Sequence, residues 1–208
     1  MEIEVVILAA GYSSRADGFK MSFKLDGKPV LHRVIQVFHK ICARIFVVSG
    51  HRAVEIEKLA AGYKNVRVVY NPRYDDGMFS SVQAGAACVQ AARFFFTPGD
   101  YPLIGPDVCR KLLAVRSEVV IPTFGGRKGH PVLLDGALAP EIVREPPDSN
   151  LKRFLQRKTC QLTEVGDAGI LIDLDTQEDY AALRRMAEAR AVSPQEKTVC
   201  GTDHKEER

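Results

Sequence analysis

Short apolar runs recur at regular intervals along the chain as far as Pro122. They are rich in Val, Ile and Phe, which is typical of buried strands. The runs cover residues 3–8, 44–48, 66–70, 94–97 and 119–121. Between them, apolar residues at helical spacing occupy residues 31–39, 54–61, 80–92 and 107–115. Strands and helices that alternate at this interval predict βαβ units, and so an α/β fold with a largely parallel sheet.

The pattern changes after Pro122. A glycine-rich turn leads into short elements and a final helix, for which Thr176 is the expected N-cap. The predicted elements are the turn 125–129, strands 131–134, 161–165 and 170–174, and helices 137–143, 150–156 and 177–188. Because this segment is too short to form a hydrophobic core of its own, we expect a single domain over residues 1–189, in two halves of about 1–122 and 123–189. The polar composition of residues 190–208 predicts a flexible tail.

Glycine and polar residues directly follow four of the predicted strands. They are Gly11, Ser49 with Gly50, Asn71, and Gly99 with Asp100. Parallel strands present their carboxyl ends at one edge of a sheet, and ligands of such sheets bind beyond those ends, near a topological switch point. The candidate functional residues should therefore gather along one edge.

Composition narrows the possible functions only modestly. With 208 residues and a net charge of +3, the chain carries too little positive charge to argue for nucleic-acid binding. The five cysteines are odd in number and form no C-x-x-C pair, which gives little support to a disulfide framework or a zinc site. The start lacks a basic signal-peptide region, and no run of 18 apolar residues occurs. We therefore expect a cytoplasmic protein without a membrane span.

The loop after the first strand has the character of a phosphate cradle. It reads L-A-A-G-Y-S-S-R over residues 8–15, with Lys20 following. Backbone N–H groups can approach phosphate only where side chains are small, and Arg15 and Lys20 add two cations. The spacing matches neither a P-loop nor a dinucleotide-binding G-x-G-x-x-G. The Arg15 guanidinium suits a bidentate grip on phosphate oxygens, and the Lys20 ammonium suits a point charge beside a phosphate; the alternative is an exposed Arg and Lys without a ligand.

Asp100 is the first candidate for a metal ligand. It lies just past a predicted strand in T-P-G-D-Y-P-L, where Pro102 prevents the chain from continuing as strand or helix. Magnesium takes one or two carboxylates together with phosphate oxygens and water. The alternative role for Asp100 is to cap a turn.

Each of the remaining candidate residues could have an ordinary structural role instead of a functional one. Gly77, Ser80 and Ser81 are expected to precede a helix that begins near Phe79, where free N–H groups and hydroxyls could meet ribose or base; they could equally cap that helix. His130, between Gly129 and Pro131, could contact an acceptor molecule or be a satisfied structural histidine.

Taken together, these motifs resemble those of the MobA-like nucleotidyltransferases. The resemblance covers about residues 3–187 and is closest to the branch that cytidylylates the molybdopterin cofactor. One spacing departs from the usual pattern, because the glycine that follows Arg15 stands three places after it, at Gly18, instead of two. The matching segments are the loop 8–15 with Lys20, residues 74–78 with Ser80 and Ser81, and residues 99–103, 129–131 and 173–176.

The resemblance implies a fold, a reaction and further site residues. The fold would be a three-layer Rossmann-like α/β structure with a mixed, mostly parallel sheet, similar to the nucleotide-diphospho-sugar transferases. The reaction would transfer CMP from CTP to molybdopterin carrying molybdenum, with Mg²⁺ and release of pyrophosphate. Asp175 would be a second metal ligand, although with Thr176 it could simply start the last helix. The base would face Leu8, Ala9, Ala10 and Gly11, and Ala10 favours cytosine over guanine.

Other functions remain open from the sequence. Within the enzyme class, GTP could replace CTP, or a sugar phosphate could be the acceptor; glycosyl transfer is more distant, since D-x-D at Asp173 and Asp175 is a weak signal. A different class is a non-catalytic carrier that hands the cofactor to a molybdenum hydroxylase or its maturation factor. A carrier would need neither Lys20 nor a metal carboxylate, so the presence of Lys20 and Asp100 favours an enzyme.

Overall fold

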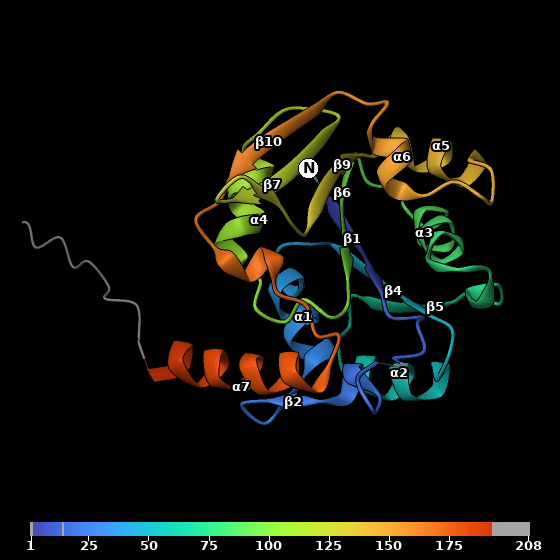
Figure 1. The fold of residues 1–208 in the computed structure, drawn as a ribbon. Helices are drawn as coiled ribbons and strands as arrows, with labels where there is room; N and C mark the ends of the chain where they lie inside the picture. The colour runs from blue at the N-terminus through green and yellow to red at the C-terminus, as the bar shows by residue number, and fades with distance from the viewer. Residues whose placement is uncertain (1, 14, 193–208) are drawn as a thin grey trace, which may run out of the picture.

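A computed structural model of the chain describes residues 2–13 and 15–192 (Figure 1). Its centre is an eight-stranded sheet in the order β10-β7-β9-β6-β1-β4-β5, with β8 paired to β7. The strands are β1 (Ile3–Leu8), β4 (Arg44–Ser49), β5 (Val66–Tyr70), β6 (Arg93–Pro98), β7 (Val119–Phe124), β8 (Arg127–Lys128), β9 (Val132–Asp135) and β10 (Cys160–Glu164). All five apolar runs of the first part of the sequence are therefore strands of one sheet.

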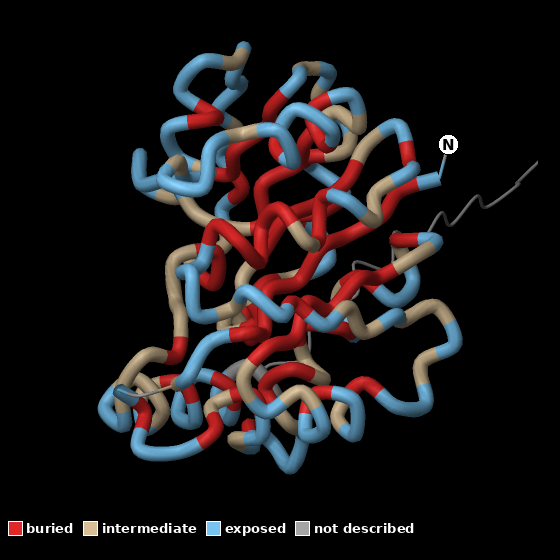
Figure 2. Tube along the Cα trace, turned by 90° about the vertical axis from the view of Figure 1, so that its right-hand side faces the viewer, coloured by how far each residue is buried: buried red, intermediate tan, exposed pale blue. Residues whose placement is uncertain are grey.

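Helices cover both faces of this sheet, which gives the expected three layers. Successive residues of β1 point to opposite faces: Val5 and Ile7 pack with one set of helices, whereas Val6 and Leu8 pack with the other. Figure 2 shows the resulting buried zone through the middle of the molecule. The first set is α1 (Val30–His39), α2 (Ala53–Ala60) and α4 (Pro106–Leu113), and the second is α3 (Met78–Ala86), α5 (Leu138–Arg144) and α6 (Leu151–Leu155).

The sheet is mixed because two strands run against the others. Strand β9 is antiparallel to both β6 and β7, and β8 is antiparallel to β7. The remaining pairs, β1 with β4 and β6, β4 with β5, and β7 with β10, are parallel. The predicted mostly parallel, Rossmann-like sheet is confirmed, and β8 is an addition within the glycine-rich turn that the sequence pattern did not predict.

Helix α3 ends earlier than predicted. The pattern suggested a helix over residues 80–92, but α3 spans Met78–Ala86. The buried carboxylate of Glu4 accepts the backbone N–H groups of Gln90 at 2.7 Å and Ala91 at 2.9 Å. Because these bonds hold residues 90 and 91 against β1, the chain leaves the helix and enters β6 there.

The predicted strand at residues 170–174 is wrong. The structure has a 3₁₀ helix, η3 (Ala168–Leu171), followed by an irregular segment. The Asp167 side chain accepts the N–H of Gly169 at 2.8 Å, and a Cβ at position 169 would lie 2.3 Å from the Leu103 carbonyl oxygen. A capped glycine in such close contact with the neighbouring loop fixes a tight turn where an extended strand was expected.

The last helix, α7 (Gln177–Val192), is longer than predicted. Thr176 is confirmed as its N-cap, since the Asp179 N–H donates to Thr176 Oγ1 at 3.1 Å. The predicted tail starts at residue 190, which lies within this helix, and residues 193–208 lie outside the described residues. Helix α7 packs through Leu183 and Ala187 against Leu25 of a small hairpin, β2 (Lys24–Leu25) with β3 (Lys28–Pro29).

The strand order creates a switch point beside β1. The chain moves from β1 to β4 and β5 on one side and then returns to β6 on the other side of β1. The loops that follow β1 and β6 therefore leave the sheet next to each other, at the carboxyl ends where ligands of such sheets bind. No helix in the described part of the chain is long and apolar enough to cross a membrane.

Candidate active site

The loop after β1 forms one wall of a cavity of about 390 Å³. We call this cavity the cradle. Hydrogen bonds tie the loop to β4 and the segment after it: Ala9 N–H donates to the Val48 carbonyl at 2.8 Å, and His51 N–H donates to the Ala10 carbonyl at 3.1 Å. Of the predicted site residues, the cradle brings together Leu8, Ala9, Ala10, Gly11, Lys20, Gly77, Ser81 and Asp100.

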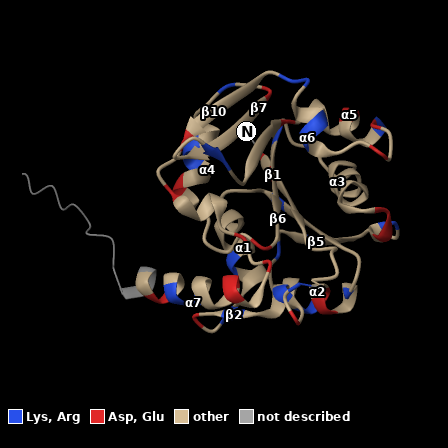
Figure 3. Cartoon of the chain, viewed as in Figure 1, with Lys and Arg blue, Asp and Glu red and all other residues tan. Residues whose placement is uncertain are grey.

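Four charged side chains meet at the edge of the cradle. Lys20 Nζ lies 2.5 Å from Asp100 Oδ2 and 3.2 Å from Asp175 Oδ1. Arg15 completes the group through Nη2, which lies 2.9 Å from Asp175 Oδ2. In Figure 3, acidic and basic segments meet where the loop after β6 approaches the start of α7. Two cations and two carboxylates, expected from three separate segments, therefore form one ion-pair cluster.

Lys20 is held as a cation within this cluster. Burial by itself lowers the pKa of its ammonium group, but the carboxylates of Asp100 and Asp175 more than compensate, so that the pKa lies above its ordinary value. Lys20 and Asp100 are both largely buried, whereas the Arg15 side chain is 72% exposed. Lys20 therefore presents a fixed positive charge, whereas Arg15 is exposed and held by an ion pair with Asp175.

The loop after β6 places Asp100 by a close backbone approach. Gly99 N–H donates to the Leu8 carbonyl at 2.8 Å, and a Cβ at position 99 would lie 2.9 Å from that oxygen. Only a glycine lets the loop lie this close to the end of β1. The Asp100 side chain then points toward Lys20, and its Oδ1 is buried without a hydrogen-bond partner among the described residues.

Asp173 and Asp175 both lie near this cluster. Both lie in the irregular segment 172–175 that precedes α7. Asp175 pairs with Lys20 and Arg15. Burial raises the pKa of Asp173, and the neighbouring charges of Asp175 and Asp100 raise it further. The alternative role of Asp175 as a helix start belongs instead to Thr176 and Asp179.

The two serines are placed differently from expectation. They do not precede the helix but lie within α3, which starts at Met78. Ser80 Oγ donates to the carbonyls of Arg73 at 2.6 Å and Gly77 at 2.8 Å, and Asn71 Nδ2 donates to both hydroxyls at 2.9 Å. Ser80 therefore fastens the loop before α3, whereas Ser81 lines the cradle. Gly77, with φ of 96°, supplies a backbone conformation that glycine favours.

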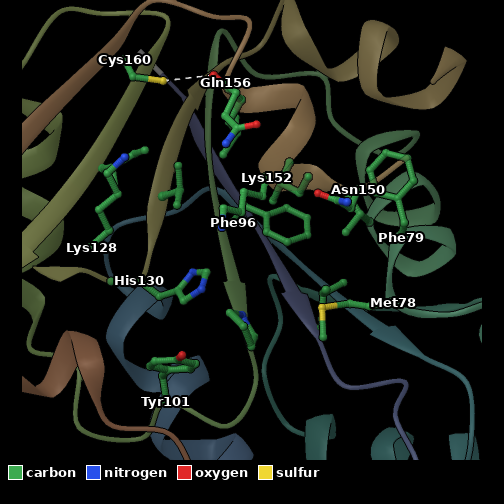
Figure 4. Close-up of a pocket in the computed structure, with 18 residues that line it drawn as sticks. Met78, Phe79, Phe96, Tyr101, Lys128, His130, Asn150, Lys152, Gln156 and Cys160 are labelled. Carbon is green, nitrogen blue, oxygen red and sulfur yellow. Dashed lines mark hydrogen bonds between the residues drawn. The ribbon is translucent and has the colours of Figure 1, made fainter. Parts of the chain in front are cut away.

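A second cavity of about 610 Å³ adjoins the cradle, and the two share Leu8, Met78 and Pro98 in their walls. We call it the acceptor cavity. Figure 4 shows Tyr101 and Met78 toward one end of it and Gln156 and Cys160 toward the other. Apolar side chains, including Phe79, Phe96 and Leu155, make up much of its lining.

His130 lies in the acceptor cavity rather than in the cradle. Its ring packs edge-on against Tyr101, with centroids 4.9 Å apart. Burial lowers the pKa of its imidazole to about 4, although the nearby negative charge of Asp100 acts to raise this pKa. Its Nδ1 is buried and has no hydrogen-bond partner within the described ranges. The imidazole is thus neutral near pH 7 and offers one open hydrogen-bonding position.

Several lining residues were missed by sequence reasoning. Tyr12 donates a hydrogen bond to Asp75 across the cradle and packs on His51, with ring centroids 4.6 Å apart. Met78, 72% exposed, stands between the two cavities. An aromatic residue within the L-A-A-G-Y loop was the available signal for Tyr12. Lys128, Asn150, Lys152, Gln156 and Cys160 line the acceptor cavity without any motif that marks them.

An ion-pair cluster at the switch point of a Rossmann-like sheet, beside a second cavity, is the arrangement expected of a nucleotide-binding α/β protein that transfers a group. Comparison with known families agrees. The sequence model of the MobA-like NTP transferase domain matches residues 5–164. The chain belongs to the MobA-like NTP transferase family and is a nucleotidyltransferase.

Two relatives indicate the chemistry carried out by similar proteins. The chain is 31% identical over 179 residues to the molybdenum cofactor cytidylyltransferase of Escherichia coli strain K12, covering 86% of this chain and 93% of the relative. It is 32% identical over 104 residues to a probable molybdenum cofactor guanylyltransferase of Thermococcus sibiricus, covering 49% of each chain.

Solved structures share the fold. A nucleotidyl transferase from Methanothermobacter thermautotrophicus superposes with a TM-score of 0.80 at 23% identity, covering 91% of this chain and 99% of the other. Rv0371c of Mycobacterium tuberculosis, solved in complex with manganese, gives a TM-score of 0.73 at 23% identity, covering 89% and 99%. At these identities the likeness establishes the nucleotidyltransferase type of fold.

Proposed function

We propose that this protein transfers CMP from CTP to the molybdenum-bearing molybdopterin cofactor and releases pyrophosphate. The observation that carries the proposal is the shared wall between the cradle and the acceptor cavity, with Lys20 and Asp100 beside it. A nucleotide in one cavity and an acceptor in the other would meet at Leu8, Met78 and Pro98. The 31% identical cytidylyltransferase supports this choice of nucleotide and acceptor.

In this proposal the cradle residues position the triphosphate. Arg15 grips the leaving β and γ phosphates, and Lys20 stabilises the charge that develops around the α-phosphorus. Holding the attacking phosphate and the α-phosphate in line can contribute roughly 7 to 11 kcal/mol to lowering the barrier. The backbone of Leu8, Ala9, Ala10 and Gly11 faces the base, and the Ser81 hydroxyl and Gly77 lie at the ribose side.

We further propose that a divalent ion, Mg²⁺, is held by Asp100 and Asp175. The residues fit such an ion: Asp100 Oδ1 is buried and unpartnered in the described structure, and oxygens of both carboxylates already surround one cation, Lys20 Nζ. Two carboxylates together with phosphate oxygens and water are the donors that Mg²⁺ prefers. When bound, the ion would neutralise charge on the phosphates.

Ligand binding would then rearrange the charges of the cluster. Arg15 and Lys20 are at present paired with the carboxylates that would bind the metal. A metal–nucleotide complex brings both a cation for the carboxylates and anions for Arg15 and Lys20. The metal would replace Arg15 and Lys20 as the cation bound to the carboxylates, and the phosphates would replace the carboxylates as the anions bound to Arg15 and Lys20. We therefore expect metal and nucleotide to strengthen each other's binding.

For the acceptor half, about residues 123–189, we propose that the larger cavity receives the pterin. His130 is neutral near pH 7 and would contact the acceptor by a hydrogen bond rather than by charge. Transfer would take place in the cytoplasm, and the product would pass to a molybdenum hydroxylase or its maturation factor.

A second candidate uses GTP with the same acceptor. The guanylyltransferase relative supports it, although that match covers only 49% of either chain. Ala10 decides against it in our proposal, because the related guanylyl-transferring branch of the family usually has a glycine at this position.

The proposed function is tested by pyrophosphate release. Purified protein with Mg²⁺ is given each of CTP, GTP, ATP and UTP, with and without the molybdenum-bearing cofactor. Release that needs the cofactor and prefers CTP is the expected result. Preference for GTP would replace the nucleotide but keep the reaction. Release that is independent of the cofactor would overturn the proposed acceptor.

A further inference from the structure

Three aromatic side chains from three separate segments pack together at the cradle. Tyr12 follows β1, His51 follows β4, and Tyr74 belongs to η2 (Tyr74–Asp76), the 3₁₀ helix before α3. The ring centroids of Tyr12 and His51 lie 4.6 Å apart, those of Tyr12 and Tyr74 5.8 Å, and those of His51 and Tyr74 6.4 Å. We call these three residues the aromatic cluster. Tyr12 and Tyr74 line the cradle, whereas His51 supports the Tyr12 ring from outside the lining.

The aromatic cluster is packed tightly against the loop after β1. The His51 N–H donates to the Ala10 carbonyl at 3.1 Å. A Cβ at position 50 would lie 2.5 Å from the Cβ of Tyr74 and 3.0 Å from that of Ala10. Only a glycine at position 50 therefore lets Tyr74 and this loop approach the same point at the end of β4. The cluster is thus held beside residues 8–11, the backbone expected to face the base.

Tyr12 keeps part of its ring surface open although it has neighbours on two sides. The residue is 53% exposed while its ring contacts His51 and Tyr74, and its hydroxyl donates to Asp75. The side chain is therefore held in one orientation without being enclosed. An aromatic ring that is fixed before a ligand arrives loses little conformational entropy when it binds one.

The aromatic cluster and the ion-pair cluster divide the cradle between them. The ion-pair cluster consists of Arg15, Lys20, Asp100 and Asp175, and it has no member in common with the aromatic cluster. Both contribute to the lining of one cavity of about 390 Å³. Charged groups suit phosphates, whereas aromatic rings suit a flat, uncharged heterocycle that can stack on them. The cradle thus offers a separate surface for each end of a nucleotide.

We propose that the aromatic cluster is a stacking platform for the base of the bound nucleotide, and that the ring of Tyr12 is the part that contacts the base. This rests on the proposed function, which places a nucleoside triphosphate in the cradle with its base toward residues 8–11. Because every base has a π-face, the platform adds affinity for purines and pyrimidines alike. The choice between bases is left to the backbone around Ala10. The contact with His51 holds the ring, so the Tyr12 hydroxyl is not required.

The test uses three ligands and three variants of the full-length chain. The ligands are CTP, GTP and inorganic tripolyphosphate, which has the phosphates but no base. Tyr12→Ala removes the ring, and Tyr12→Phe removes only the hydroxyl. The matched control is Tyr70→Ala, which removes a tyrosine that is 56% exposed at the end of β5 and does not line the cradle. Isothermal titration calorimetry with Mg²⁺ and without acceptor measures each affinity.

We expect Tyr12→Ala to bind CTP and GTP more weakly than wild type by the same factor, about tenfold. Its affinity for tripolyphosphate should stay within about twofold of wild type, which also shows that the variant is folded. Tyr12→Phe and Tyr70→Ala should bind all three ligands as wild type does.

Three results would overturn the inference alone. They are a Tyr12→Ala protein that keeps its affinity for CTP, one that loses affinity for tripolyphosphate as much as for CTP, and a Tyr12→Phe protein that loses as much as Tyr12→Ala. Failure of the proposed function is a different observation, namely wild-type protein that binds CTP more tightly than tripolyphosphate but transfers no CMP to the cofactor. That result would remove the proposed reaction and leave the platform in place.

Discussion

The cradle and the acceptor cavity share a wall, but they differ in whether their cationic side chains are paired with carboxylates. In the cradle, Arg15 and Lys20 are paired with Asp100 and Asp175 before any ligand binds. In the acceptor cavity, Lys128 and Lys152 have no carboxylate partner in the described chain, and the surface around them is largely apolar.

This difference implies different modes of binding. A ligand in the cradle must replace existing ion pairs, so its affinity depends on bringing a metal ion and phosphates together. A ligand in the acceptor cavity meets unpaired ammonium groups and displaces water from apolar surface, so it gains free energy from both effects. Binding of the nucleotide should therefore be strongly metal-dependent, whereas binding of the acceptor should not.

The largest expected effect concerns Lys20. Replacement by Ala removes the cation nearest the proposed α-phosphate, and turnover should fall by about 10² to 10³. Lys24→Ala, four residues along the chain and outside the cradle lining, is the matched control and should leave turnover unchanged. Steady-state kinetics measures both. If turnover of Lys20→Ala stayed within a few-fold of wild type, Lys20 would not be the residue that stabilises the charge at the α-phosphate.

His130 should make stability depend on pH. Its pKa is about 4 in the folded protein and close to 6.5 when unfolded, so only the unfolded state takes up a proton between these values. The free energy of unfolding should thus fall as the pH drops from 6.5 to 4, by up to about 3 kcal/mol relative to a His130→Gln variant. Urea unfolding of both proteins at several pH values measures this. A constant difference between them would mean that the imidazole is charged in the cavity.

Loss of a metal ligand should weaken binding in the cradle but leave binding in the acceptor cavity unchanged. Asp100→Asn removes one proposed ligand, and Mn²⁺ binding in the presence of CTP should weaken at least about tenfold. Electron paramagnetic resonance of free Mn²⁺ reports the affinity without turnover. Binding of the acceptor should stay unchanged in the same variant. Unaltered Mn²⁺ affinity would place the metal elsewhere.

The choice of base should respond to position 10. Ala10→Gly takes the loop toward the guanylyl-transferring pattern, and we expect the ratio of kcat/KM for CTP to that for GTP to drop several-fold, by about 1 kcal/mol in transition-state binding. The KM of the acceptor should not change, because Ala10 does not line its cavity. An unchanged ratio would mean that this position does not read the base.

The smallest effect is expected from loss of the Tyr12 hydroxyl. This hydroxyl donates to the Asp75 carboxylate, and this hydrogen bond raises the pKa of the phenol to about 12. The side chain is exposed, so Tyr12→Phe should change the KM of CTP by less than about twofold. A much larger change, measured in the same assay, would make the Tyr12 to Asp75 contact part of nucleotide binding.

The sequence correctly predicts those helices and strands whose formation depends mainly on their own residues. The run of residues 3–8 is apolar except for Glu4 because both faces of β1 are covered, and it is a strand as predicted. Residues 170–174 have a similar apolar content but form no strand, since contact with Leu103 and the cap from Asp167 fix a turn there. The end of α3 likewise depends on Glu4, a residue that lies 86 positions before Gln90.

The same distinction applies to the candidate sites. The cradle comes mainly from a compact loop and a short motif around Asp100, so eight of its lining residues, though not Tyr12, could be named in advance. The acceptor cavity draws Lys128, Lys152 and Cys160 from three elements, with no shared pattern to connect them. Only the packing of β8, α6 and β10 around His130 reveals that they face one space.

The most direct test of the central claim is the fate of the α-phosphate. The protein is incubated with Mg²⁺, CTP labelled at the α-phosphorus with ³²P, and the molybdenum-bearing cofactor, and the products are separated. The account predicts that the label moves to the cofactor in step with pyrophosphate release, and that without the cofactor it remains in CTP. Label recovered as free CMP, or label that stays in bound CTP when the cofactor is present, would contradict transfer between the two cavities.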